Sequence, residues 1–189
     1  MVGEYLVCKV VEAIMEEEIK QKRKRSRKLP KCVRSEEWIK LIQVIPKKEI
    51  VFRIAVLSAY ASGLRLSEVL RFSPEHITKN SIFVPESKYG VERYVPIPKG
   101  WKEEFVKYIP LKISGRTIQR YFKKYSNLAG LNPKYTFHSL RHGFAVRCLE
   151  TGMPINQVQV LLGHANISTT SIYVKANPLD AIKNYEDYF

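Results

Sequence analysis

The chain has 189 residues, of which 45% are hydrophobic and 26% are charged, a composition that predicts a folded domain rather than a disordered chain. Its 32 lysine and arginine residues against 18 aspartate and glutamate residues give a net charge of +14, so we expect a polyanionic partner, nucleic acid before an anionic membrane surface. No apolar run approaches the roughly 18 residues that span a bilayer, which argues against a membrane protein.

The first 30 residues combine a helical pattern with a basic run. Leu6, Val10 and Ile14 recur at helical spacing, and charges within this stretch argue against a secretory signal. Seven of the nine residues from 20 to 28 are basic. We predict that this run lies along a phosphate backbone, with a solvated linker as the alternative. The residues predicted to make these contacts are Lys22, Arg23, Lys24 and Arg25.

The chain contains three cysteines, and none of them shares a CxxC spacing with another. A disulfide or zinc framework needs paired cysteines at regular spacing. We therefore predict reduced thiols in a cytoplasmic protein.

Helices are predicted throughout the segment that follows the basic run. Ser35 is a plausible N-cap for the first of them. Its buried face is marked by Trp38, Leu41, Ile42 and Ile45. A second helix, over residues 48–62, is apolar on nearly all sides, which is typical of a central core helix. It ends at Gly63, so Arg65, close to its end, should be held by rigid structure, and a helix restarts over 66–70.

The only clear β pattern lies in the middle of the chain. Residues 82–84 and 91–97 predict two strands joined by a turn over 86–90, which places Lys88 near the tip of a hairpin. Helical segments over 101–109 and 115–128 follow. The second mixes basic and aromatic residues, which suits a helix that packs on one side and meets phosphates on the other, although a solvated amphipathic helix is the alternative. Its candidate DNA contacts are Arg116, Arg120, Lys123 and Lys124.

Candidate catalytic residues are concentrated near the C-terminus. His138 and Arg141 are three apart, which places them on one face of a helix. A short helix over 154–162 should be broken by Gly163, and His164 follows. Tyr173 stands nine residues beyond that histidine. A phenol with a pKa near ~10 is a weak nucleophile at neutral pH, but cations and a base can activate it.

Four stretches together resemble the catalytic domain of the tyrosine recombinase (phage integrase) family, over roughly residues 31–176. They are Ala61–Glu68, Lys88 with Arg93–Pro98, His138–Ala145, and Leu161–His164 with Ile172–Tyr173. The resemblance implies an α+β, mainly α-helical fold with a small antiparallel β-hairpin or three-stranded sheet. It divides the chain into an N-terminal helix and basic linker (1–30), a DNA-breaking and rejoining domain (31–176) and a C-terminal tail helix (177–189).

The resemblance also implies a mechanism. A tyrosine would attack a DNA phosphorus to give a 3′-phosphotyrosyl bond, arginines would hold the non-bridging oxygens, and a lysine would protonate the leaving 5′-oxygen. The implied catalytic residues are Arg65, Lys88, His138, Arg141, His164 and Tyr173, and which histidine is the base stays open. No metal or other cofactor is expected. The expected partners are a double-stranded DNA recombination site and, on that DNA, a homotetramer.

Other interpretations account for some of these residues. Taken singly, Arg65 is a surface ion-pair partner for Glu68, Tyr173 is a packing residue, and His138 with His142 is half of a zinc site without further ligands. A non-catalytic DNA-binding module with a helix-turn-helix over 154–173 would explain the charge but leave Arg65, Lys88 and the His138/Arg141 pair unexplained. A type IB topoisomerase would share the phosphotyrosyl chemistry but act alone on supercoiled DNA. A small nuclease and an inactive integrase are further alternatives.

Overall fold

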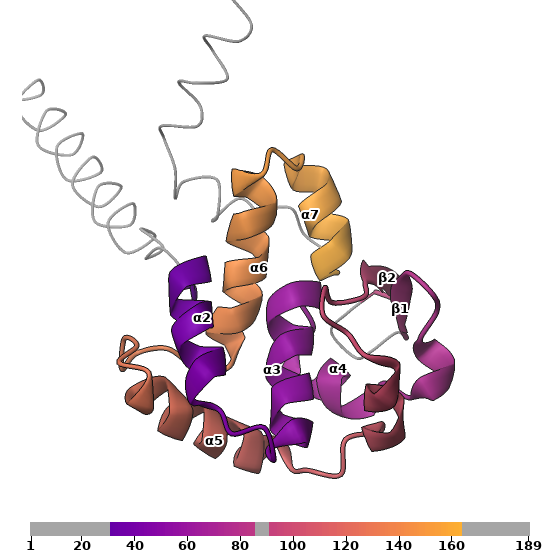
Figure 1. The fold of residues 1–189 in the computed structure, drawn as a ribbon. Helices are drawn as coiled ribbons and strands as arrows, with labels where there is room; N and C mark the ends of the chain where they lie inside the picture. The colour runs from indigo at the N-terminus through magenta and orange to yellow at the C-terminus, as the bar shows by residue number, and fades with distance from the viewer. Residues whose placement is uncertain (1–30, 86–90, 164–189) are drawn as a thin grey trace, which may run out of the picture.

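The computed structural model describes residues 31–85 and 91–163. These residues form a largely helical domain with a small β-hairpin at one side (Figure 1). The helices are α2 (Ser35–Val44), α3 (Ile50–Ser62), α4 (Leu66–Arg71), α5 (Gly115–Leu128), α6 (His138–Glu150) and α7 (Ile155–Leu162), with 3₁₀ turns η1 (Pro74–His76) and η2 (Glu103–Tyr108) and strands β1 (Ser81–Val84) and β2 (Arg93–Pro96). This confirms the predicted mainly helical fold with an antiparallel hairpin.

Helix α3 is the central core element, as its apolar composition predicts. Figure 1 shows it in the middle of the domain, and α4, α5 and α6 pack against it. The apolar side chains of α3 with at most 1% of their surface exposed are Phe52, Ile54, Ala55, Val56 and Ala59. A helix that is covered on several sides in this way gives the residues at its C-terminal end a rigid base.

Helix α2 packs through the predicted apolar face, but it begins one residue earlier than expected. Leu41 and Ile45 are buried, and the Trp38 ring stacks on the Tyr60 ring at a centroid distance of 4.1 Å. Arg34, not Ser35, is the N-cap. The predicted cap is wrong because Arg34 O accepts the first helical N–H, that of Trp38, at 2.8 Å. Glu37 accepts the backbone N–H of Arg34 at 2.9 Å, as the third helical residue does in a capping box.

The second strand of the hairpin is shorter than the predicted 91–97, and the first begins one residue before the predicted 82–84. β1 and β2 pair antiparallel, with Val84 opposite Arg93 and Ser81 opposite Pro96. Within the described ranges the sheet has two strands, with one isolated bridge from Ile77 to Ile82. The predicted turn over 86–90 lies outside the described residues. The helical segment expected over 101–109 is the 3₁₀ helix η2.

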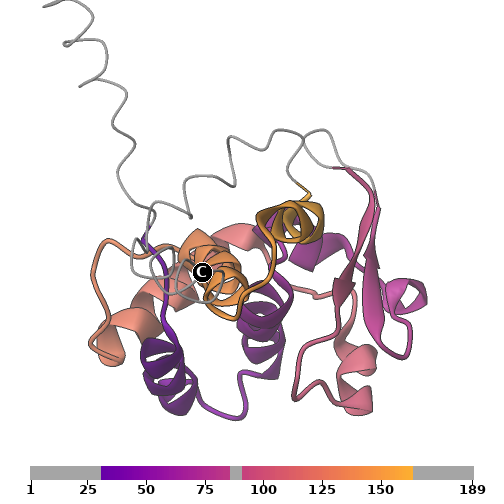
Figure 2. The same cartoon turned by 90° about the horizontal axis from the view of Figure 1, so that it is seen from above.

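The segment before α2 crosses α6 at very close range. Val33 donates its backbone N–H to Ser139 O at 3.1 Å, and a Cβ at Gly143 would lie 2.3 Å from Val33 O. Only glycine therefore allows the chain to lie against α6 here. The second of the two views, Figure 2, shows this segment beside α6. None of the helices in the part of the chain that the structure describes is long and apolar enough to cross a bilayer.

Candidate active site

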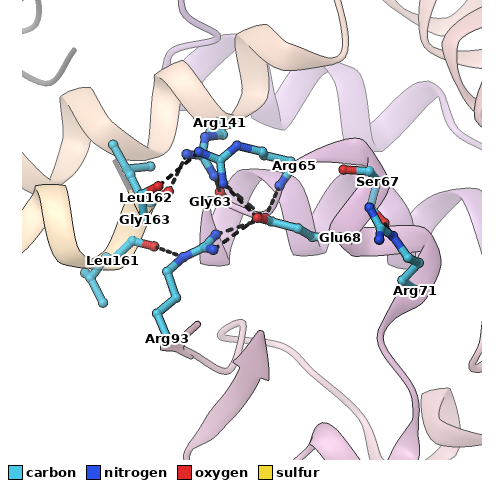
Figure 3. A network of polar contacts seen from close by, with 10 residues as sticks. All are labelled: Gly63, Arg65, Ser67, Glu68, Arg71, Arg93, Arg141, Leu161, Leu162 and Gly163. Carbon is cyan, nitrogen blue, oxygen red and sulfur yellow. Dashed lines mark hydrogen bonds and ion pairs between the residues drawn. The ribbon is translucent and has the colours of Figure 1, made fainter. Parts of the chain in front are cut away.

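A buried carboxylate stands at the centre of a group of arginines (Figure 3). Arg93 donates Nη1 to Glu68 Oε1 at 3.0 Å and Nη2 to Oε2 at 2.9 Å. Arg65 donates Nη1 to Oε1 at 2.8 Å, and Arg141 Nη1 lies 3.8 Å from Oε2. Burial acts to raise the pKa of Glu68, but the hydrogen bonds and charge of Arg93, then the bonds from Arg65, outweigh it and lower the pKa to about 2. The group therefore keeps an excess of positive charge.

The same three guanidinium groups also cap the C-terminal end of α7. Leu161 O accepts from Arg93 Nε at 2.7 Å. Leu162 O accepts from Arg141 Nη2, and Gly163 O accepts from Arg65 Nη2 at 3.2 Å. The last carbonyls of a helix have no partner within the helix and carry partial negative charge. The arginines satisfy these carbonyls, which ties α7 firmly to α4, α6 and β2.

The turn between α3 and α4 sets the position of Arg65. Gly63 adopts a left-handed conformation with φ of 68°, and a Cβ there would lie 2.6 Å from the Phe144 ring. Gly63 O accepts from Arg141 Nη1 at 2.7 Å. Arg65 then caps α4, and its backbone N–H donates to Glu68 Oε2 at 2.7 Å. A glycine is thus required where the chain turns from the core helix toward the arginine group.

His138 lies beside this group at the start of α6. Burial lowers the pKa of His138, and the positive charges of Arg141 and Arg65 lower it further, against a smaller opposite effect of Glu68. The imidazole is therefore neutral at pH 7 and able to accept a proton. Its ring meets the His142 ring edge to face at a centroid distance of 4.6 Å.

Three of the six predicted catalytic residues are brought together by the structure. Arg65 and Arg141 both contact Glu68 and α7, and both influence His138. Lys88, His164 and Tyr173 lie outside the described residues, as do the predicted DNA contacts in the basic run, Lys22, Arg23, Lys24 and Arg25. The catalytic roles of all six residues stay predictions.

Two residues of the group were not among the predicted site residues. Glu68 appeared only as an ion-pair partner for Arg65, and that pair does form. Arg93 was noted within a motif without a role, yet it is 6% exposed. The available signal was strand alternation, which places Arg93 on the face opposite the exposed Tyr94 and Pro96 and therefore toward the core. Within residues 31–85 and 91–163, no group of three or more His, Cys, Asp or Glu side chains is arranged to hold a metal ion.

The histidine pair predicts how stability depends on pH. Burial, then the charges of His138 and Arg141, lower the pKa of His142 from 6.5 to about 4. Between these values the unfolded chain binds a proton that the folded chain does not, so the free energy of unfolding should decrease as the pH falls from 6.5 to 4, by up to about 1.4 kcal/mol per pH unit.

Denaturant unfolding between pH 7 and pH 4.5 measures this slope. His142→Gln removes the titrating group and should flatten the slope by a comparable amount. A variant with an unchanged slope would contradict the assignment, and so would a ¹³C resonance of His142 that titrates near pH 6.5 in the folded protein.

Comparison with known proteins decides the family. Residues 31–179 match the phage integrase family. The chain belongs to the phage integrase family. Tyrosine recombinase XerA of Pyrococcus furiosus is 39% identical over 167 residues, which are 78% of this chain and 58% of the relative. Tyrosine recombinase XerC of Escherichia coli is 33% identical, over 79% of this chain and 57% of the relative.

Solved structures of phage integrase relatives share the fold. A crystal structure of XerA recombinase matches with a TM-score of 0.66 and 25% identity, over 87% of this chain and 65% of that protein. A lambda integrase dimer bound to a COC′ core site matches with a TM-score of 0.61 and 22% identity, over 79% of this chain and 60% of that protein. This phage integrase family member thus spans somewhat under two thirds of the length of the relatives named here.

Proposed function

We propose that the chain carries the catalytic centre of a site-specific tyrosine recombinase, which cleaves and rejoins DNA strands through a 3′-phosphotyrosyl intermediate. One observation carries the proposal: Arg65 and Arg141, from separate helices, meet at the C-terminal end of α7, where Gly163 directly precedes His164. The names of the relatives, which are tyrosine recombinases, support the same activity.

In the proposed reaction, the hydroxyl oxygen of Tyr173 attacks a DNA phosphorus. A bond forms from that oxygen to phosphorus while the bond from phosphorus to the 5′-oxygen breaks. The phenol proton passes to a base, for which neutral His138 is the candidate, and Lys88 supplies a proton to the leaving 5′-oxygen. The 5′-hydroxyl of a second strand then reverses these steps, so no bond energy is lost to hydrolysis.

The two arginines stabilise the charge that develops on the phosphate. Negative charge increases on the non-bridging oxygens in the pentacoordinate transition state, and guanidinium groups bind two oxygens at once. Both side chains are held in place by Glu68 and by backbone carbonyls, so little reorganisation is needed when the phosphate arrives. Preorganised donors of this kind typically contribute 10²–10³ in rate each.

Helix α5 offers a surface for the DNA next to this centre. The four DNA contacts predicted on this helix are all exposed. They are Arg116, Arg120, Lys123 and Lys124. Arg120 and Lys124 lie over the rings of neighbouring tyrosines, 5.9 and 5.3 Å from the centroids. A hollow of 460 Å³ is lined by Gln119 and Lys123 of α5 and also by His138. The hollow thus connects the α5 surface with His138, which supports a DNA path over α5 toward the proposed catalytic centre.

Partners on that DNA follow from the same proposal. One solved relative is a lambda integrase tetramer bound to a Holliday junction, with a TM-score of 0.59. We infer that this chain, too, works as a tetramer when two DNA sites are brought together. The tail over 177–189, which lies outside the described residues, remains our candidate for contacts between protomers.

The experiment that tests the proposal is incubation of the protein with nicked attachment-site DNA, which loses a short fragment after cleavage and so traps the intermediate. We expect a covalent protein–DNA adduct linked through tyrosine. Tight DNA binding without any adduct would favour a non-catalytic DNA-binding module. Relaxation of supercoiled DNA by a monomer without strand exchange would favour a topoisomerase.

DNA affinity should depend steeply on salt if the α5 surface contacts phosphates. Each neutralised phosphate contributes about −0.9 to the slope of log K against log salt. Replacing Arg116 and Arg120 by glutamine should therefore make the slope shallower by up to about 2, measured by fluorescence anisotropy on a duplex. Lys107→Gln, which removes an exposed charge on η2, is the matched control and should leave the slope unchanged. Equal slopes in all three proteins would contradict a DNA-binding role for α5.

A further inference from the structure

We propose that Arg93 is a positioning residue for DNA cleavage, which neutralises Glu68 so that Arg65 and Arg141 keep their full positive charge for the phosphate. This inference rests on the proposed recombinase function. Arg93 is not assigned a contact with the DNA, because its Nε and both Nη atoms already donate to Leu161 O and to the two oxygens of Glu68. It would act through the carboxylate that it holds.

Arg93 connects three elements that are far apart in the sequence. It is the first residue of β2, it bonds both oxygens of Glu68 on α4, and its Nε donates to Leu161 O on α7. Figure 3 shows its side chain extending from the strand to the carboxylate, with Leu161 to one side. The planar fork of arginine makes this set of bonds possible, because a lysine ammonium cannot present two parallel N–H groups to a carboxylate while a third donor points elsewhere.

The charges of the group show why this matters for catalysis. Arg93, Glu68 and Arg141 are almost fully buried, at 3%, 4% and 2% side-chain exposure, whereas the side chain of Arg65 is 23% exposed. The buried pair cancels internally and leaves the charges of Arg65 and Arg141 for a ligand. Without Arg93, the carboxylate would draw on Arg65 and Arg141 alone and offset one of their two charges.

The end of α7 is shaped around the Arg93 side chain. A Cβ at Gly163 would lie 2.9 Å from Arg93 Nη1 and 3.0 Å from Cδ, and the residue has a φ of +59°. Glycine therefore satisfies the helix C-cap and leaves room for the guanidinium at once. Arg93 thereby helps to fix the end of α7 at Gly163, the residue that precedes the predicted catalytic His164 in the sequence.

Variants of Arg93 test the inference when cleavage and DNA binding are measured separately. We expect Arg93→Gln to slow single-turnover adduct formation at saturating DNA by about 100-fold, with the Kd for DNA changed only a few-fold. The matched control is Arg53→Gln, because Arg53 also donates to carbonyls at a helix end, those of Ile42 and Ile45 at 3.1 and 2.7 Å, and lies outside the arginine group. It should lower the Tm and leave the cleavage rate unchanged.

A double variant separates action through Glu68 from a merely structural role. If Arg93 acts by neutralising the carboxylate, then Glu68→Gln removes the charge that Arg93 offsets, and the double variant should cleave no more slowly than Arg93→Gln alone. If the losses in cleavage rate of Arg93→Gln and Glu68→Gln multiply in the double variant, the inference is overturned. If Arg93→Gln does not fold, Arg93→Lys decides. It keeps the positive charge that neutralises Glu68, so it should fold and cleave within a few-fold of the wild-type rate, and a folded Arg93→Lys that cleaves about 100-fold more slowly would overturn the inference.

The failure of the inference differs from the failure of the proposed function. A wild-type protein that forms no adduct would overturn the recombinase proposal and this inference together. An active wild-type protein with an equally active Arg93→Gln variant would overturn the inference alone.

Discussion

Tyr173→Phe is expected to abolish the covalent protein–DNA adduct completely and to leave DNA binding within a few-fold of wild type. The substitution removes a single oxygen, which is the atom that forms the bond to phosphorus in the proposed reaction. A phenylalanine ring keeps nearly the same volume and loses only the hydroxyl. Trapping on nicked DNA, resolved by denaturing gel electrophoresis, measures the adduct, and anisotropy measures the affinity.

A matched substitution at another tyrosine controls for general effects. Tyr94 on β2 is 60% exposed, so Tyr94→Phe removes a hydroxyl from the surface of the same domain and should form the adduct at the wild-type rate. An adduct in Tyr173→Phe would show that another side chain is the nucleophile. Loss of DNA affinity in parallel with loss of the adduct would show that the hydroxyl serves binding rather than chemistry.

Glu68→Ala is expected to destabilise the fold by about 3–5 kcal/mol, the range found when one partner of a buried ion pair is removed. It removes the carboxylate that accepts from Arg93 and Arg65 and lies close to Arg141. Three guanidinium groups would then repel one another in a largely buried place. Denaturant unfolding, followed by tryptophan fluorescence, measures the loss.

An exposed ion pair provides the control for Glu68. Glu104 pairs with Lys102 at 3.6 Å, with 57% and 67% of the two side chains exposed. Glu104→Ala should therefore change the free energy of unfolding by well under 1 kcal/mol. A loss at Glu68 no larger than at Glu104 would mean that water or anions replace the carboxylate, and it would contradict the central role that we give to Glu68.

Local patterns in the sequence were sufficient to predict most of the fold. The uninterrupted apolar character of α3 identifies it as the core helix, since a helix that is apolar on all sides must be covered on all sides. The end of that helix at Gly63 and the antiparallel hairpin were also predicted, because glycine and alternation act over a few residues. The N-cap of α2 was missed by one residue, since Glu37 binds the backbone N–H of Arg34 and Arg34 O accepts the first helical N–H.

The site was predictable only in its components. Spacing alone placed His138 and Arg141 on one helical face, and the resemblance to the family grouped Arg65 with them. Strand alternation places Arg93 on the same face as the buried Val95, opposite Tyr94, which is 60% exposed. It does not show which distant groups the guanidinium contacts.

The sequence by itself determined the helices, the hairpin and the excess of positive charge, since each depends on residues that are neighbours in the chain or on composition alone. The tertiary structure decided that Glu68 would unite the arginines and that they would cap α7. The bonds that do so join residues 21, 25, 68 and 98 positions apart. Contacts across such separations form only when packing of the core has brought the elements together, and so packing creates the site.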